Sequence, residues 1–139
     1  MRVEVVPAKV RGSEGLLSQA LWNLVENAVK YRRPDVAVRV EVRGWARRQL
    51  YELRVTDNGI GMTPDETTKA FDPLYRARRS VQVSGSGLGL SIVKRVVEAS
   101  GGTISVYSDL GHGTTFIVNL PIVEEVADRA LAARAARSR

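Results

Sequence analysis

The sequence contains no cysteine, and it has a single histidine, His112, among its 139 residues. A chain without cysteine forms neither disulfides nor thiolate metal sites, and one histidine cannot make the cluster that zinc requires. Any metal ion must therefore be bound through oxygen ligands.

Long hydrophobic runs are also absent. No apolar stretch approaches the roughly 20 residues that a helix needs to cross a bilayer. The N-terminal segment MRVEVVPAKVRG alternates charged residues with valine and lacks the apolar core of a signal peptide. We therefore expect a domain that is not embedded in a membrane and that works in the cytoplasm, which is also compatible with a parent protein anchored in the inner membrane.

Aromatic residues are scarce, at 6%, whereas 21 lysines and arginines against 15 acidic residues give a net charge of +6. Excess positive charge can indicate nucleic-acid binding. The arginines are, however, spread over predicted loops and the C-terminal tail, without the basic helix or aromatic-studded basic strand that nucleic-acid readers use. We expect a solvated arginine-rich surface and no nucleic-acid partner.

Hydrophobic periodicity predicts one α+β domain followed by a short tail. The predicted strands cover 2–6, 36–43, 50–56, 102–109 and 114–121. The predicted helices cover 13–31, a short stretch from 64, 87–100 and the Ala/Arg-rich tail 122–139, and segments 44–49 and 72–86 are a predicted turn and loop. This mixed order favours a two-layer α/β sandwich, in which about three helices cover one face of a mixed, mostly antiparallel sheet.

Local signals place the ends of the helices. Ser13 is a predicted N-cap. Thr63 and Glu66 have the spacing of a capping box, with proline at the first helical position. Gly101 and Gly102 are predicted to end the helix over 87–100.

The helix over 13–31 contains two asparagines one turn apart, Asn23 and Asn27, in the stretch NLVENAVKY. Asparagine is a poor helix former because its amide competes for nearby backbone groups. One interpretation is an ordinary solvated face. The other is that the amide oxygens face a ligand, because a neutral oxygen can complete the octahedral shell of Mg²⁺ beside phosphates. Lys30, one turn along, would then supply positive charge to those phosphates.

The segment DNGIG follows the strand predicted to end at Thr56. Asp57 places a carboxylate at a strand end, and Gly59 and Gly61 allow the backbone to approach a ligand closely. An ordinary Asx turn is the alternative. The functional interpretation is that Asp57 accepts a hydrogen bond from an exocyclic amine such as N6 of adenine. The further acidic positions of an EF-hand loop are missing, which disfavours calcium.

A third glycine-rich segment, GSGLGLSIVKRVVE, is neither a Walker A loop nor a good dinucleotide-binding fingerprint. Gly85, Gly87 and Gly89 nevertheless leave backbone N–H groups uncovered at the start of a predicted helix, where the helix dipole favours an anion. A flexible linker explains these glycines less well, because a strongly periodic helix follows at once. The segment is therefore a candidate site for a phosphate chain.

The segments NLVENAVKY, DNGIG, AFDPLYR and GSGLGLSIVKRVVEASGG, followed by GHGTTFIVNLP, resemble in order the N, G1, F and G2 boxes of the catalytic ATP-binding domain of bacterial sensor histidine kinases. That domain belongs to the superfamily shared with DNA gyrase and has the Bergerat fold. The resemblance covers residues 1–121 and leaves 122–139 as a tail. It implies ATP and Mg²⁺ as cofactors.

The resemblance implies roles for four positions on the first helix. Asn27 would bind Mg²⁺ with Asn23 as a second polar contact, Lys30 would reach the phosphates, and Tyr31 would pack on adenine. In the ATPases of the superfamily, a glutamate one turn before the magnesium asparagine activates water. Asn23 takes that place here, which points to phosphoryl transfer rather than hydrolysis and puts Asn23 and Lys30 among the implied catalytic residues.

The other matched positions follow the helix in sequence. Asp57 would select adenine, and Gly59 and Gly61 would let the loop approach the base. Arg76, in LYR, would reach the γ-phosphate and stabilise the transferring phosphoryl group, which completes the implied catalytic set. The edge that follows the ATP lid is matched by Gly85, Gly87, Leu88 and Gly89.

The resemblance also implies partners. A sensor histidine kinase phosphorylates a histidine on a separate dimerisation domain, in the same parent protein or in trans, and indirectly acts on a response regulator. His112 lies in a GHG turn and is not the expected acceptor. Two alternatives remain open, an anti-sigma-factor serine kinase of the same superfamily and a non-catalytic module that senses ATP. The arginine of the F box and the long G2 segment favour the sensor kinase over the serine kinase.

Overall fold

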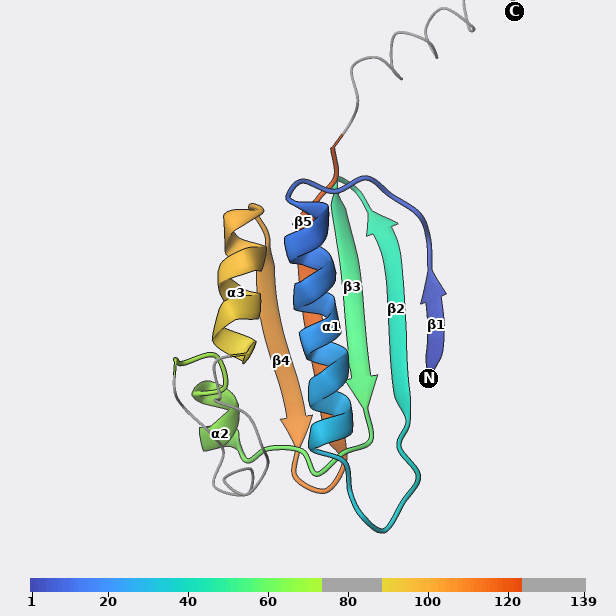
Figure 1. The fold of residues 1–139 in the computed structure, drawn as a ribbon, viewed down its shortest axis with the longest axis vertical. Helices are drawn as coiled ribbons and strands as arrows, with labels where there is room; N and C mark the ends of the chain where they lie inside the picture. Colours follow the sequence, from blue (N-terminus) through green and yellow to red (C-terminus); the bar gives the residue numbers. More distant parts are fainter. Residues whose placement is uncertain (74–88, 124–139) are drawn as a thin grey trace, which may run out of the picture.

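The computed structural model describes residues 1–73 and 89–123. In chain order its elements are β1 (Arg2–Val5), α1 (Glu14–Lys30), β2 (Val40–Arg47), β3 (Leu50–Asp57), α2 (Pro64–Thr68), α3 (Gly89–Ala99), β4 (Thr103–Asp109) and β5 (Gly113–Pro121) (Figure 1). The helix predicted over 122–139 lies outside the described ranges from residue 124 on. At its start the prediction was wrong, because Ile122 forms an isolated antiparallel bridge with Val10. None of the helices in those ranges is long and apolar enough to span a bilayer.

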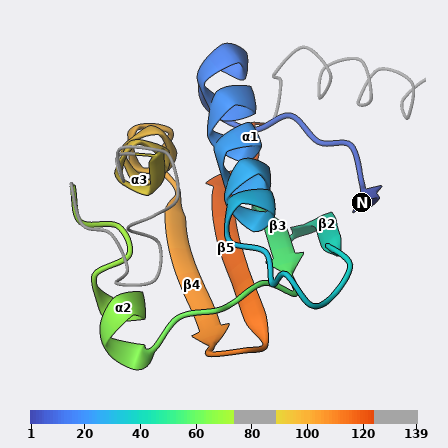
Figure 2. The ribbon, with the colours of Figure 1, turned by 60° about the horizontal axis from the view of Figure 1, so that its bottom comes forward.

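The five strands form one mixed sheet in the order β1-β2-β3-β5-β4. β1 and β2 pair in parallel, whereas the other three neighbouring pairs are antiparallel. The described helices lie on one face of this sheet, with α1 over its middle and α3 beside α1 (Figures 1 and 2). The predicted two-layer α+β sandwich is confirmed.

The hydrophobic core lies between α1, α3 and the sheet. Three residues of α1 at a spacing of four, Ala20, Leu24 and Ala28, are buried, and Val93 and Val97 of α3 are buried with them. This spacing places the apolar residues of α1 on one stripe that faces the sheet. The strands contribute the buried residues Val40, Leu53, Val55, Phe116, Val118 and Leu120.

The caps predicted for the first two helices are confirmed. The hydroxyl of Ser13 accepts the N–H of Leu16 at 3.4 Å and begins α1. At α2, the N–H of Glu66 donates to the Thr63 hydroxyl at 3.2 Å, and the N–H of Thr63 donates to the Glu66 carboxylate at 3.0 Å. This reciprocal pair satisfies two backbone donors that the helix itself leaves unpaired.

The predicted glycine stop of α3 is also confirmed. Gly101 has φ +82°, a conformation that glycine adopts without steric cost. Its N–H donates to the carbonyl of Glu98, and the N–H of Gly102 donates to the carbonyl of Val97. These two bonds form a Schellman motif, which satisfies carbonyls at the end of the helix.

The prediction for the second strand was wrong in its position. The expected strand was 36–43, but β2 spans Val40–Arg47. Residues 37–39 are held in a loop by Asn58, whose side-chain amide donates to the carbonyl of Ala37 and accepts the N–H of Arg39, both at 2.8 Å. Alternation of valine with charge did not reveal these contacts with a residue that lies 19 and 21 positions further along the chain.

The predicted turn over 44–49 is correspondingly shorter. Gly44 lies inside β2, where a side chain would overlap the hydroxyl group of Tyr51. The Tyr51 hydroxyl donates to the carbonyl of Val6 at 2.6 Å and so links β3 to the chain that leaves β1. The turn itself consists of Arg48 and Gln49, and Arg48 has φ +57°.

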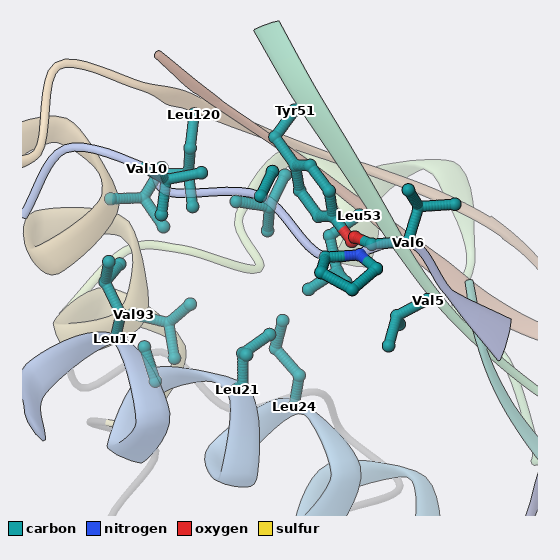
Figure 3. Close-up of a pocket in the computed structure, with 15 residues that line it drawn as sticks. Val5, Val6, Val10, Leu17, Leu21, Leu24, Tyr51, Leu53, Val93 and Leu120 are labelled. Carbon is teal, nitrogen blue, oxygen red and sulfur yellow. The ribbon is translucent and has the colours of Figure 1, made fainter. Parts of the chain in front are cut away.

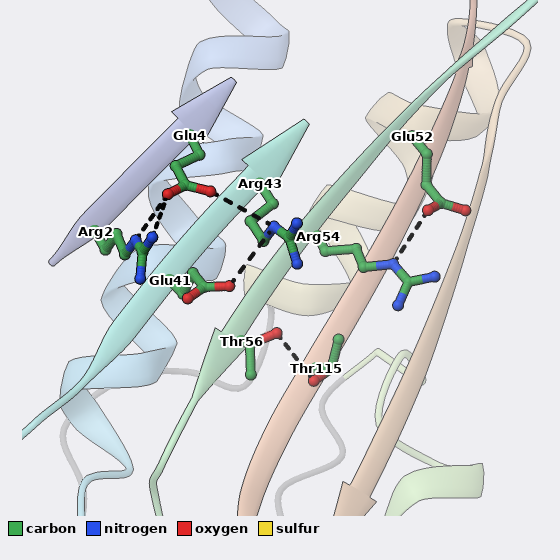
Figure 4. Close-up of polar contacts among 8 residues, drawn as sticks. All are labelled: Arg2, Glu4, Glu41, Arg43, Glu52, Arg54, Thr56 and Thr115. Atoms are coloured by element: carbon green, nitrogen blue, oxygen red, sulfur yellow. Dashed lines mark hydrogen bonds and ion pairs between the residues drawn. The ribbon is translucent and has the colours of Figure 1, made fainter. Parts of the chain in front are cut away.

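The sheet face opposite the helices is polar. Its contacts are the ion pairs Arg2–Glu4, Arg43–Glu4, Arg43–Glu41 and Arg54–Glu52 and the hydroxyl pair Thr56–Thr115 (Figure 4). Each exposed pair contributes little to stability. Together they keep this face in water, as expected for an antiparallel sheet that is covered on one side.

Candidate functional site

The last turn of α1, the end of β3 and the turn between β4 and β5 meet at one end of the sandwich, the lower end in Figure 1. The N–H of Ile60 donates to the carbonyl of Tyr31 at 2.9 Å, and the N–H of Gly111 donates to the carbonyl of Ile60 at 2.7 Å. The loop that follows β3 is thereby fixed between the helix and the hairpin. Tyr31 and Asp57, which are distant in sequence, lie at the same end of the molecule.

Asp57 is the last residue of β3 and is half-buried. Its Oδ1 accepts the N–H of Gly59 at 2.8 Å and the N–H of Thr114 at 3.3 Å. Burial raises the pKa of the carboxyl group above its usual value, and the two backbone hydrogen bonds partly oppose this rise. Its Oδ2 makes no hydrogen bond to any residue within 1–73 and 89–123.

The structure gives a packing reason for the glycines beside Asp57. A side chain at Gly59 would come within 2.5 Å of the carbonyl oxygen of Tyr31. Gly61 has φ +70°, and a side chain there would overlap the carbonyl of Asp109. Both glycines are therefore needed for contacts within the protein, and their predicted approach to a nucleotide stays a prediction.

The predicted polar stripe of α1 lies on the flank of that helix. Asn23 and Asn27 are half-buried, and each stands one residue before a buried core residue. Neither side-chain amide is hydrogen-bonded to another described residue. Lys30 is exposed in the last turn, and Tyr31 caps the helix by donating its N–H to the carbonyl of Asn27 at 3.0 Å.

Glu26 is the acidic neighbour of this stripe, and it is half-buried. Its carboxylate accepts the indole N–H of Trp22 at 2.9 Å. Because Trp22 is 60% exposed, this contact lies on the outer side of the helix. The Glu26 carboxylate is therefore engaged within its own helix.

Several predicted site residues lie outside the described ranges, namely Arg76, Gly85, Gly87 and Leu88. Gly89 is described and is the first residue of α3, where an added side chain would meet no atom within 4 Å. Phe71 of the F box packs against Phe116 with ring centroids 6.2 Å apart, and Lys94 of α3 lies 5.7 Å from the centre of the Phe71 ring. These contacts connect the segment before residue 74 with α3 and β5.

An apolar cavity of about 280 Å³ lies elsewhere, between α1 and the sheet. Figure 3 shows Leu17, Leu21 and Leu24 of α1 facing Tyr51 and Leu53 across it. No predicted site residue is among those that line it. Burial in these surroundings raises the pKa of Tyr51. The cavity is part of the core and is separate from the candidate site.

The sequence did not reveal two parts of this site. Thr114 binds the Asp57 carboxylate through its backbone N–H, and a side chain at the adjacent Gly113 would overlap the Asp57 carbonyl. Arg33 donates to two carbonyls in the surrounding loops. A backbone N–H donor cannot be recognised from the residue type. In a chain with many arginines, nothing in the sequence distinguishes Arg33 from the others. Only the pairing of β3 with β5 shows that the GHG turn, residues 111–113, lies beside the end of β3.

The comparison with known families decides what this arrangement belongs to. Residues 12–124 match the family described as "Histidine kinase-, DNA gyrase B-, and HSP90-like ATPase". The chain belongs to this family. Within it, the chain is a catalytic ATP-binding domain of the sensor histidine kinase type, as its relatives indicate.

The relatives of this ATPase-family domain are sensor kinases. "Sensor-like histidine kinase SenX3" of Mycobacterium tuberculosis is 41% identical over 119 residues, which is 84% of this chain and 28% of that protein. A solved structure of "Mycobacterial sensor histidine kinase MprB" has a TM-score of 0.79 at 34% identity and covers 89% of this chain and 84% of that one. The structure of full-length ShkA in complex with AMPPNP has a TM-score of 0.71 at 29% identity. The match covers 88% of this chain and 26% of that one. The chain spans less than a third of the length of the curated relatives that it matches.

Proposed function

We propose that this domain binds Mg·ATP and donates the γ-phosphoryl group to a histidine on a separate dimerisation domain, in the cytoplasm. The placement of Asp57 supports this proposal most. One carboxylate oxygen is held by two backbone amides, while the other is not hydrogen-bonded within the described residues. A carboxylate fixed in this way can accept a hydrogen bond from the exocyclic amine of adenine. The related ShkA structure contains AMPPNP, an analogue of ATP.

The remaining predicted residues take complementary roles in this proposal. Tyr31 would pack on adenine, since it lies at the same end of the fold as Asp57. Lys30, exposed in the last turn of α1, would reach the phosphates. In this proposal, the edge that covers the triphosphate would be supplied by Gly85, Gly87, Leu88 and Gly89.

Phosphoryl transfer requires little covalent chemistry from the protein. A nitrogen of the acceptor imidazole attacks the γ-phosphorus, the bond to the bridging oxygen breaks, and ADP leaves with that electron pair. The proton displaced from the imidazole goes to solvent. The domain would contribute position and positive charge, through Lys30 and Arg76. Asn23 stands where hydrolysing relatives would have a glutamate, so water activation is not favoured. A response regulator would then receive the phosphoryl group from the histidine.

The residues of α1 fit a magnesium ion only together with a nucleotide. Within residues 1–73 and 89–123, no three His, Cys, Asp or Glu side chains gather into a metal site. The side-chain oxygen of Asn27 is a neutral metal ligand that accepts no hydrogen bond from another residue in those ranges. Such an oxygen suits Mg²⁺ that is also bound by phosphates and water. When bound there, the ion would neutralise phosphate charge.

Calorimetric titration with Mg·ATP tests the proposal. Asp57→Asn should weaken binding roughly 10- to 100-fold, because a hydrogen bond to a charged acceptor is typically worth about 1.5–3 kcal/mol. Asn27→Ala should weaken Mg·ATP binding to a similar extent and should have less effect when magnesium is omitted. Glu98→Gln and Asn119→Ala are matched controls on the exposed side of α3 and on the outer face of the sheet.

Both controls should bind Mg·ATP as the unchanged protein does. The site assignment fails if the affinities of Asp57→Asn and Asn27→Ala also stay unchanged. The proposal as a whole fails if the unchanged protein binds no ATP at millimolar concentration.

A further inference from the structure

Arg33 connects three segments of the candidate site. Its Nε donates to the carbonyl of Asn58 at 3.1 Å, and its Nη1 donates to the carbonyl of Gly111 at 2.8 Å. Arg33 itself follows the end of α1 by three residues and is half-buried. One guanidinium group thus joins the end of α1, the loop after β3 and the turn between β4 and β5.

The two carbonyls that Arg33 binds belong to the segments that hold the Asp57 carboxylate. Asn58 separates Asp57 from Gly59, whose N–H binds Oδ1 of Asp57. Gly111 lies in the turn that precedes Thr114, whose N–H binds the same oxygen. The direction of the carboxylate therefore depends on how these two segments sit relative to each other.

The polar groups of Asn58 make hydrogen bonds within the protein. Its side-chain amide binds Ala37 and Arg39, and its N–H donates to the carbonyl of Arg39 at 3.3 Å. Asn58 thus anchors the loop on the side of β2. Arg33 provides the corresponding side-chain anchor on the side of the β4–β5 turn.

We propose that Arg33 is a positioning residue that aims the Asp57 carboxylate at the 6-amino group of the purine and thereby sets base selectivity. This inference rests on the proposed binding of ATP. The planar guanidinium holds two acceptors in a fixed geometry. A lysine at this position would offer a single charge centre without that fork and would hold the two segments less firmly.

Arg32 provides a matched control. It is the adjacent arginine, it is exposed, and its Nη1 donates to the carbonyl of Val29 within its own helix end at 3.0 Å. Arg32→Gln therefore removes the same charge from nearly the same place without touching either segment around Asp57. Any difference between Arg33→Gln and Arg32→Gln reports on the bridge rather than on net charge.

The binding experiment compares Mg·ATP with the triphosphate of purine riboside, which lacks the 6-amino group. Arg33→Gln should weaken ATP binding about tenfold and leave the affinity for the analogue within twofold of its original value, so selectivity falls. The selectivity of Arg33→Lys for ATP should lie between that of the unchanged protein and that of Arg33→Gln. Arg32→Gln should keep full selectivity. Equal losses for both nucleotides, or no loss for ATP, would overturn the inference.

Hydrogen exchange without nucleotide separates this inference from the proposed function. In Arg33→Gln the amides of Gly59, Gly111 and Thr114 should exchange at least tenfold faster, whereas those of Val55 and Val118 in the sheet should not change. Unaltered exchange at the three loop amides, or uniform acceleration throughout the sheet, would contradict a positioning role. If the unchanged protein binds neither nucleotide, the proposed function fails, and the exchange rates still decide whether Arg33 fixes the loops.

Discussion

Asp57 combines partial burial with two backbone hydrogen bonds, and these have opposite effects on its charge. Burial disfavours the ionised carboxylate and is the larger cause, so the pKa lies above 3.8, the ordinary value of an aspartate. The N–H groups of Gly59 and Thr114 stabilise the ionised form and limit the rise. A carboxylate kept partly out of water, with one oxygen already oriented, is well prepared to bind a donor without further reorganisation.

This raised pKa predicts how stability depends on pH. The folded protein binds more protons than the unfolded chain at pH values between 3.8 and the higher pKa of the folded state. The free energy of unfolding should therefore decrease as pH rises through that window and should not change further above it, as far as Asp57 is concerned. Asp57→Asn removes this dependence. Urea denaturation of both proteins from pH 3.5 upward should show the variant gaining relative stability as pH rises.

The opposite outcome, in which the variant loses relative stability as pH rises, would mean that the carboxylate is stabilised by the fold and that its pKa is lowered. ATP binding provides an independent check on the same group. Because the ionised form accepts the proposed hydrogen bond, affinity should begin to fall on acidification at a higher pH than for an ordinary aspartate.

The β4–β5 hairpin is the element on which the site depends most, although the predicted motifs emphasised α1. Its turn accepts a hydrogen bond from Arg33, donates one to Ile60, and begins the strand that provides the Thr114 amide. Gly111 and Gly113 both have positive φ, at +82° and +97°. Their surroundings differ, because a side chain at Gly111 meets no atom within 4 Å, whereas one at Gly113 would overlap the carbonyl of Asp57.

These two glycines allow backbone strain to be separated from steric overlap. Gly111→Ala should lower the free energy of unfolding by about 1–2 kcal/mol, the cost of a left-handed backbone for a residue with a side chain. Gly113→Ala should cost more than about 3 kcal/mol, because strain and overlap add. Urea denaturation measures both. Equal losses of unfolding free energy in the two variants would mean that β5 can move away from Asp57. The contact between Gly113 and Asp57 would then not be rigid.

The element boundaries also show what local patterns cannot resolve. The valine alternation over 36–43 predicts a strand, yet β2 begins at Val40, because Asn58 holds residues 37–39 in a loop. The helix caps were predicted correctly, since the Ser13 cap and the Thr63–Glu66 box involve partners within a few residues. Prediction succeeded where the interacting groups are neighbours in sequence and failed where the partner is remote.

At the scale of the whole molecule, all described helices lie on one face of the sheet, and the candidate site lies at one end of that layer (Figure 1). The proposed phosphoryl transfer to an external acceptor suits a site at the end of the fold rather than inside the core. His112 is exposed in the β4–β5 turn and donates its backbone N–H to the carbonyl of Asp109. It lies in a turn rather than on a helix, unlike the acceptor expected on a dimerisation domain.

A transfer assay follows from this arrangement. With ATP labelled at the γ-phosphate, the domain should label a histidine-bearing dimerisation domain of a related sensor kinase and should itself stay unlabelled. His112→Gln should transfer as the unchanged protein does. Label on the domain that disappears in His112→Gln would show that this histidine is an acceptor and would contradict the proposal. Release of inorganic phosphate without labelled partner would favour hydrolysis.

The sequence by itself determined the fold class, the order of the elements apart from the displaced second strand, and the family, because periodicity, caps and motif order are local properties. It also identified Asn27, Tyr31 and Asp57 as candidates, since their residue types and spacing carry the chemistry. Only the tertiary structure decided what holds Asp57: the backbone of Thr114, the room left by Gly59 and Gly113, and the bridge formed by Arg33. These contacts join segments up to 78 residues apart. They use main-chain groups that nearly every residue possesses, so no pattern of side chains predicts them.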